Sequence, residues 1–216
     1  MLPSPLNHAN TLHPVNQRDI IVIGAGQAGL AVGYFLRRTG LSSTILDGER
    51  GPGGAWRHAW ESLHLFSPAQ WSSLPGSPMP PSGEEYPSAS HVIEYLTRYE
   101  ERYQLPVERP VEVTAVTSAP DGVLVHTSSG DWKAGAVVSA TGTWRGPVIP
   151  NYPGLDSYKG LQIHSAQYSN SGAFHGMRVL VVGGGNSATQ ILAEVTLVAQ
   201  TAWAVQEPPQ FLPDDV

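Results

Sequence analysis

An α/β fold built from two strand–loop–helix units is what the sequence predicts, on three observations. An aliphatic run leads into G-x-G-x-x-G at residues 24–29. A second run leads into G-x-G-x-x-A at residues 183–188. The same number of residues separates Gly24 from Asp47 as separates Gly183 from Gln206. The repeat indicates two Rossmann-like dinucleotide-binding units, and because few residues follow the second helix, we expect that unit to be truncated.

The first unit begins at residues 19–23, where uninterrupted aliphatic residues are typical of a parallel strand buried on both faces. In the loop that follows, Gly24 permits the tight turn, Gly26 lets the backbone approach a pyrophosphate, and Gly29 lets the helix pack close to the strand. The helix is expected to stop at Gly40. An ordinary turn with incidental glycines is the weaker alternative. The diphosphate is expected at the helix start, on Gly24, Gly26, Gln27, Ala28 and Gly29.

A second strand is predicted over residues 41–46, and it ends in Asp47, where an acceptor for a ribose 2′-hydroxyl belongs. The next loop carries paired glycines, which allow the backbone to lie beside a flat or phosphorylated ligand. Here we expect cofactor contacts from Gly54, Ala55 and Trp56, with the indole as a wall. A surface loop with a half-buried tryptophan is the alternative.

The middle of the chain supplies structural elements. Residues 60–87 are too apolar for a free linker and are expected to pack as an ordered excursion. A helix is predicted to begin at Ser90, whose side chain can cap the first turn. An antiparallel meander follows over 111–117, 123–127 and 132–133. A separate buried strand over 136–142 brings Thr141 toward a cofactor, although such a sequence also ends ordinary strands.

We therefore divide the chain into four parts. Residues 1–17 form a disordered tail, 18–148 an FAD-type domain with the meander, 149–175 a linker, and 176–216 a partial nicotinamide-binding domain. The second unit offers Gly183, Gly185, Asn186, Ser187 and Gln206 as cofactor contacts.

Composition excludes several classes of function. The net charge is −6 without a basic cluster, which argues against nucleic acid. No cysteine is present, so no redox dithiol, disulfide framework or thiolate metal site is available, and we expect no bound metal. No stretch reaches about 18 apolar residues, so we expect no membrane span and a cytoplasmic location.

Two dinucleotide sites in one chain predict electron transfer between two cofactors, FAD and NADH or NADPH. Asp47 suits the unphosphorylated adenosine of FAD. At Gln206 and Glu207 no arginine or lysine is available to pair a 2′-phosphate, and Glu207 would repel one. We therefore expect the second site to accept NADH at least as readily as NADPH.

Between the two units, residues 158–168 place Gly160, His164, Ser165 and Tyr168 in a pattern that resembles the fingerprint of the flavin-containing monooxygenases, with Tyr158 where that family has phenylalanine. The likeness extends from residue 19 to the end of the chain. It is strongest to small bacterial members, including those near arsenic-resistance genes.

The resemblance implies that one oxygen of O2 is inserted, through a flavin C4a-(hydro)peroxide, into a small organic substrate: a thioether, an amine or a ketone. For His164 it implies a domain-orienting role, favoured over catalytic acid or base. It leaves a homodimer open.

Two departures from the family stand out. Ser73-Leu74-Pro75 replaces the family's Asn-Leu-Pro, so Ser73 becomes the candidate contact for oxygen intermediates. The chain also stops after one β-α-β of the second unit, which indicates a fragment or a naturally short relative that binds FAD weakly. An NAD(P)H oxidase or flavin reductase, and a non-catalytic flavoprotein, are the alternative functions.

Overall fold

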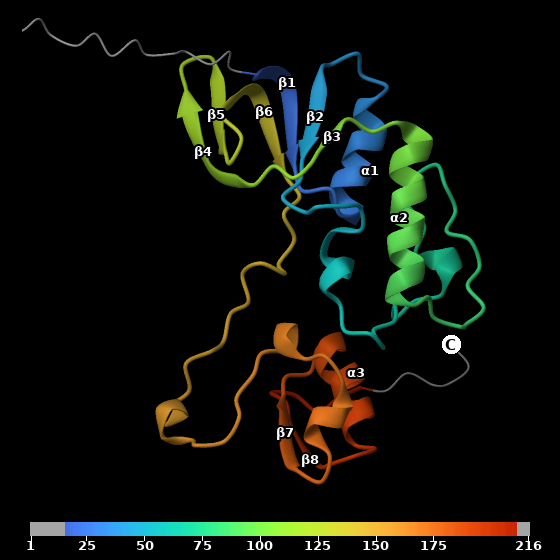
Figure 1. Ribbon diagram of the computed structural model, residues 1–216, viewed down its shortest axis with the longest axis vertical. Coiled ribbons are helices and arrows are strands. Elements are labelled where there is room, and N and C mark those ends of the chain that lie inside the picture. Colours follow the sequence, from blue (N-terminus) through green and yellow to red (C-terminus); the bar gives the residue numbers. More distant parts are fainter. Residues whose placement is uncertain (1–15, 211–216) are drawn as a thin grey trace, which may run out of the picture. The chain divides into compact units, whose positions relative to one another are not determined.

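The computed structural model describes residues 16–210, which form two compact units (Figure 1). The first comprises Leu96–Thr141 and the described residues up to Gly54. The second comprises Ala55–Tyr95 and the described residues from Gly142 onward. This division differs from the predicted domain bounds, because residues 55–95 group with the C-terminal unit and not with the first.

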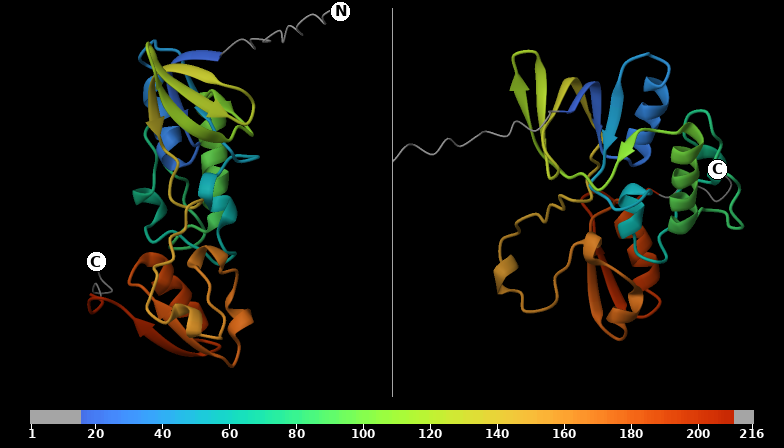
Figure 2. Two further views of the ribbon diagram at one scale, coloured as in Figure 1. Left: turned by 90° about the vertical axis from the view of Figure 1, so that its left-hand side faces the viewer. Right: turned by 45° about the horizontal axis from the view of Figure 1, so that its top comes forward.

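The first unit is built on a six-stranded sheet with the strand order β3-β2-β1-β6-β5-β4 (Figure 2). Strands β3, β2, β1 and β6 are parallel, and β5 and β4 continue the sheet in antiparallel fashion. The α/β fold class is confirmed. The strands are β1 (Asn16–Ile23), β2 (Ser43–Leu46), β3 (Val107–Glu108), β4 (Val113–Ala119), β5 (Gly122–Thr127) and β6 (Trp132–Ser139).

Strand β6 corrects the sequence prediction of two separate strands. It pairs with β5 through Trp132–Ala134 and with β1 along its whole length, from Trp132 opposite Asn16 to Ser139 opposite Ile23. One strand therefore joins the meander to the parallel part of the sheet. Asn16 and Gln17 lie in β1 and not in the predicted tail, and the rest of that tail lies outside the described residues.

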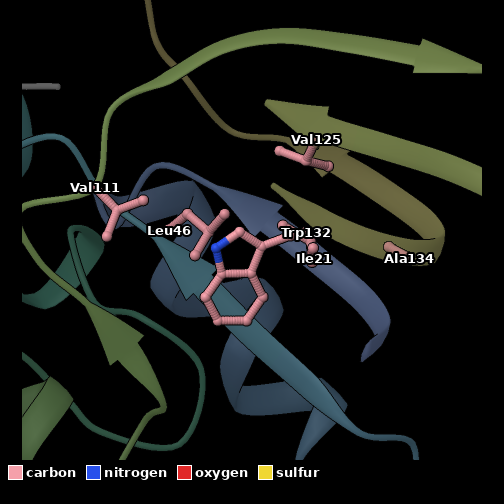
Figure 3. Packing of buried hydrophobic residues seen from close by; sticks show 6 residues of the cluster. All are labelled: Ile21, Leu46, Val111, Val125, Trp132 and Ala134. Carbon is pink, nitrogen blue, oxygen red and sulfur yellow. The ribbon is translucent and has the colours of Figure 1, made fainter. Parts of the chain in front are cut away.

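Strands β1 and β2 are buried on both faces at Ile21 and Val22 and at residues 44–46, as the aliphatic runs predicted. Residues 135, 136 and 139 of β6 are exposed, which corrects the prediction of a buried strand there. On one face, helix α1 (Gln27–Leu36) packs so close to β2 that a Cβ on Gly33 would lie 2.8 Å from Cδ1 of Ile45. A separate core cluster contains the buried ring of Trp132 and the side chain of Leu46, which Figure 3 shows together. Its buried members are Ile21, Leu46, Val111, Val125, Trp132 and Ala134.

Helix α2 (Ala89–Tyr103) begins one residue earlier than expected. The hydroxyl of Ser88, not that of Ser90, accepts a hydrogen bond from the backbone N–H of His91 at 3.4 Å. The predicted apolar stripe is buried at Val92, Leu96 and Tyr99. The stripe therefore packs as the helical period required.

The second unit contains a parallel pair of strands and several short 3-10 helices. Its core is formed by Trp60, Tyr168, Ile191 and Val195, whereas Leu180 on β7 is 61% exposed. Across residues 16–210, no helix combines the length and apolarity needed to cross a membrane. The regular elements are β7 (Arg178–Val182), α3 (Asn186–Val195) and β8 (Gln200–Ala204), and the 3-10 helices are η1 (Gly54–His58), η2 (Ala69–Trp71), η3 (Leu155–Ser157), η4 (Ser165–Gln167) and η5 (Ser171–Phe174).

Candidate functional site

The first glycine loop is held by contacts that only glycine permits. Gly24 has φ +98°, and a Cβ there would lie 2.5 Å from the carbonyl oxygen of Ala140. A Cβ on Gly29 would lie 1.8 Å from the carbonyl oxygen of Gly24. The loop, the start of α1 and the end of β6 are therefore packed backbone against backbone, which places Thr141 directly beside Gly24.

A Cβ on Gly26 would point into open space, in contrast to one on Gly24 or Gly29. Gly26 is the N-cap of α1, no side chain caps the helix there, and no atom lies within 4 Å of a Cβ built on it. The first N–H groups of a helix lack intrahelical partners, and the helix dipole favours an anion at this end. Gln27 and Ala28 are the first helical residues. The loop therefore presents the geometry that a diphosphate requires.

The paired glycines Gly53 and Gly54 adjoin the first glycine loop. A Cβ on Gly54, which has φ +53°, would lie 2.9 Å from Cα of Gly26. The backbone of Gly54 therefore lies against the first glycine loop within the first unit. Ala55 is exposed and Trp56 half-buried, and both follow Gly54 in helix η1.

Asp47 directly follows β2 and is fixed by an arginine that the sequence analysis missed. Nε of Arg109 donates to Oδ2 of Asp47 at 2.7 Å, and Nη1 and Nη2 donate to the two oxygens of Glu100 at 2.6 and 2.8 Å. Burial alone would lower the pKa of Arg109, but the hydrogen bonds and charges of Glu100 and Asp47 outweigh it and raise that pKa. The guanidinium therefore stays charged between two carboxylates.

The second unit repeats the loop with looser packing. Gly183 has φ +115°, and only Cβ of Ala188, at 4.0 Å, comes near a Cβ built on it. This distance explains why alanine is tolerated where the first loop needs Gly29. Gly185 is the N-cap of α3, without a side-chain cap, and the space around it is open. Asn186 and Ser187 begin the helix and are exposed.

The register of the strands corrects one inference from residue counting. Ile23 pairs with Leu46 in the first unit, and Val182 pairs with Ala204 in the second. The residue equivalent to Asp47 is therefore Val205, because the connection to β8 is one residue shorter. Gln206 lies one position further along and is exposed.

Ser73 takes part in a turn. Its Oγ accepts a hydrogen bond from the backbone N–H of Met79 at 2.9 Å. The hydroxyl of Tyr95 accepts from the N–H of Leu74 at 2.6 Å and donates to the carbonyl of Ser77 at 2.7 Å. The structure thus gives Ser73 a defined role in shaping this loop.

His164 caps helix η4. The ring Nδ1 of His164 accepts a hydrogen bond from the backbone N–H of Ala166 at 3.1 Å, and the backbone N–H of His164 donates to Oε1 of Gln167 at 2.9 Å. A ring nitrogen that accepts from a backbone N–H carries no proton, so the geometry selects the Nε2–H tautomer. These contacts are those of a structural residue.

Glu194 on α3 is a second residue that the sequence did not reveal. Its carboxylate accepts hydrogen bonds from Nε1 of Trp60 at 3.2 Å, from Oγ of Ser62 at 2.7 Å and from the hydroxyl of Tyr168 at 2.7 Å. Burial, together with the hydrogen bond to Glu194, raises the pKa of Tyr168. The aromatic residue of the fingerprint is therefore attached to the helix that follows the second glycine loop.

Two glycine loops of this geometry, each at the start of a helix beside a parallel strand, define a two-dinucleotide protein. The chain belongs to the family described as pyridine nucleotide-disulphide oxidoreductase, which matches residues 21–207. The predicted resemblance to bacterial flavin-containing monooxygenases is also confirmed by similarity to solved structures.

A flavin-containing monooxygenase from Stenotrophomonas maltophilia shares 55% identity with a TM-score of 0.91, over 94% of this chain and 62% of that one. An S-allyl-L-cysteine S-oxygenase from Allium sativum shares 25% identity with a TM-score of 0.78, over 93% of this chain and 54% of that one. A curated protein from Geobacillus kaustophilus, "Uncharacterized oxidoreductase CzcO-like", is 35% identical over 92% of this chain and 57% of its own length. The chain thus spans less than two thirds of each of these proteins.

Proposed function

We propose that this chain contributes the FAD-binding unit and part of the NAD(P)-binding unit of a monooxygenase. The observation that carries the proposal is the pair of open glycines, Gly26 and Gly185, each at the uncapped N-terminus of a helix. Two such sites match a flavin and a nicotinamide dinucleotide. The similarity to the flavin-containing monooxygenase from Stenotrophomonas maltophilia supports the same assignment.

The residues of the first unit fit FAD. The diphosphate would lie against Gly26 and the start of α1, with the backbone of Gly54 beside it, and Asp47 would accept from the adenosine ribose. Bound FAD would supply the chemistry, which is acceptance of a hydride from the nicotinamide and activation of O2. The chain's own residues bind the cofactor and fix its orientation. Gln27, Ala28, Gly29 and Thr141 complete the proposed contacts within this unit.

The second unit would take the nicotinamide dinucleotide on Gly183, Gly185, Asn186 and Ser187. Val205 occupies the position that Asp47 holds in the first unit, so no carboxylate stands at the strand end. Gln206 and Glu207 are the exposed polar residues that follow, and neither can pair a 2′-phosphate. We infer that NADH is used at least as readily as NADPH. Comparable kcat/KM values with the two reductants would support this inference, and a strong preference for NADPH would contradict it.

The proposed substrate is a small organic molecule with a soft nucleophilic atom. The Allium sativum relative is an oxygenase that acts at the sulfur of S-allyl-L-cysteine, as its name states, which favours a thioether over an amine or a ketone. Ser73 is proposed as a polar contact of the oxygen intermediates. His164 is proposed as a residue that orients the segment of residues 158–168, in which it lies.

An anaerobic spectral titration tests the assignment. The purified protein should show a flavin band near about 450 nm, and both NADH and NADPH should bleach it. In air with a thioether substrate, sulfoxide should form in proportion to the reductant consumed. Hydrogen peroxide without sulfoxide would indicate an oxidase or reductase instead, and a yellow protein that is not bleached would indicate a non-catalytic flavoprotein.

A further inference from the structure

The carboxylate of Asp47 is held by a buried network within the first unit. The side chains of Asp47, Arg109 and Glu100 are 7%, 11% and 17% exposed. Arg109 uses Nε on Asp47 and both terminal nitrogens on Glu100, at 2.6 to 2.8 Å. Because a guanidinium is planar and rigid, engagement of three of its donors fixes its plane. The plane in turn fixes Oδ2 of Asp47.

The second oxygen of Asp47 has a much weaker contact. Oδ1 meets the backbone N–H of Glu49 at 3.5 Å, the outer limit for a hydrogen bond. Rotation of the carboxylate would break the 2.7 Å bond between Oδ2 and Arg109, so the direction of Oδ1 is set by the network. Asp47 therefore presents one oxygen in a fixed direction with most of its accepting capacity unused.

Charge points to the kind of partner. Two carboxylates and one guanidinium leave the buried network with one net negative charge. Such a site attracts a hydrogen-bond donor and repels a phosphate. A buried ion network of this kind is weak evidence for added stability, since desolvation offsets much of the attraction between its charges. A role in recognition accounts for it better.

We propose that Arg109 and Glu100 are positioning residues, which aim Oδ1 of Asp47 at the 2′-hydroxyl of the adenosine ribose of FAD. This inference rests on the proposed function of the first unit. Glu100 acts on Arg109, Arg109 acts on Asp47, and only Asp47 contacts the ligand. Recognition of the ribose is then distributed over helix α2 and the residue that follows β3, and does not reside in Asp47 alone.

The test compares FAD with an analogue that lacks the 2′-hydroxyl of the adenosine ribose. Each is titrated into the apoprotein and followed by the change in flavin fluorescence, so that only the flavin site reports. Loss of a hydrogen bond to a charged group weakens binding by about 10- to 100-fold, and this ratio of Kd values is expected for the natural chain.

Two variants should reduce the ratio. Glu100→Gln replaces one of the three carboxylate oxygens that accept from Arg109 by an NH2 group, and Arg109→Lys cannot bond both carboxylates at once, so each should bring the ratio below about 3-fold. Glu101→Gln is the matched control, because Glu101 is the exposed neighbour of Glu100 on α2, and it should keep the full ratio. Melting temperatures of all variants identify any that fails to fold, and Glu100→Gln, the milder change, then decides.

A double-mutant cycle separates positioning from a structural role. In an Asp47→Asn background, Arg109→Lys should leave the ratio unchanged, because the carboxylate it orients is absent. If the natural chain binds FAD and discriminates against the analogue while Glu100→Gln and Arg109→Lys discriminate equally well, the positioning role is wrong and the FAD site stands. If the natural chain binds no FAD, the proposed function itself fails.

Discussion

Substitution by alanine should weaken FAD binding at Gly26 and lower the stability of the fold at Gly29, although the two glycines lie in one turn. A Cβ on Gly29 would lie 1.8 Å from the carbonyl oxygen of Gly24, whereas real Cβ contacts are not shorter than 3.0 Å. The start of α1 would have to move by about 1 Å or more, and no change of rotamer can relieve a clash with backbone. Overpacking of this kind costs about 1–3 kcal/mol, and we expect the upper end. The melting temperature should fall by about 6–12 °C.

Gly26→Ala should leave the fold intact and damage the cofactor site. Gly26 has φ −78° and open space around its missing Cβ, so the methyl group meets no strain. The weaker N-cap is offset by the reduced entropy of the unfolded chain, and the change in stability should stay within about 1 kcal/mol. The methyl group would nevertheless stand where the diphosphate approaches the helix. Loss of one charged hydrogen bond corresponds to at least about a tenfold weaker Kd for FAD.

Thermal denaturation of the apoprotein and fluorescence titration with FAD measure the two quantities separately. The expected result is a stable Gly26→Ala variant that binds FAD poorly and a destabilised Gly29→Ala variant. If Gly26→Ala binds FAD as tightly as the natural chain, the diphosphate does not lie at this helix start. An unchanged melting temperature for Gly29→Ala would refute the packing argument.

Three further predictions follow from the same structure. Glu194→Gln should cost about 1–3 kcal/mol, because an amide cannot accept three hydrogen bonds from separate donors, and Tyr168→Phe, which removes one of them, should cost about 1 kcal/mol by denaturant titration. Hydrogen bonds from the side chain and backbone of Ser42 lower the pKa of Asp19 below its ordinary value of 3.8, so ionised Asp19 stabilises the fold above that value and the contribution disappears as the pH falls through the lowered pKa. Asp19→Asn should therefore lower the melting temperature at neutral pH, and the difference from the natural chain should close in acid; a constant difference would contradict this. Val205→Asp restores an acceptor at the strand end of the second unit and should raise the ratio of kcat/KM for NADH over NADPH, a change that steady-state kinetics would detect.

The sequence predicted the elements with strong local signals. The aliphatic runs and glycine loops predicted β1, α1, β7 and α3. In the first unit, burial of the strand and close backbone contacts at the loop restrict which residues can stand there, whereas β7 is half exposed and its loop is loosely packed. The two-residue strand β3 has no periodicity to detect. Gly135 interrupts the aliphatic pattern of β6, which divided one strand into two in the prediction.

The site was predicted where a motif carries it and missed where distant residues meet. The contacts of Arg109 with Asp47 and Glu100 depend on the pairing of β2 with β3, which the sequence did not show. Glu194 lies on a helix whose pattern explains only its apolar residues. Residue counting made Gln206 the equivalent of Asp47 in the second unit. The true equivalent is Val205, because the connection before β8 is one residue shorter, and the spacing of the glycines does not reveal this.

The hydrogen bond between Trp60 and Glu194 joins residues 134 positions apart, and this separation has a consequence for synthesis of the chain. All described residues of the first unit have been made once Thr141 is added, so that unit can fold while the ribosome is still extending the chain. Trp60 and Ser62, in the segment from Ala55 to Tyr95, are synthesised well before their hydrogen-bond partner Glu194. The core around Trp60 cannot form until Ile191 and Val195 of α3 have been synthesised. We therefore expect limited proteolysis of ribosome-bound chains that lack α3 to cut the segment from Ala55 to Tyr95 and to spare β1 to β6. The second unit is thus the last to form, although a large part of it is among the first to be made.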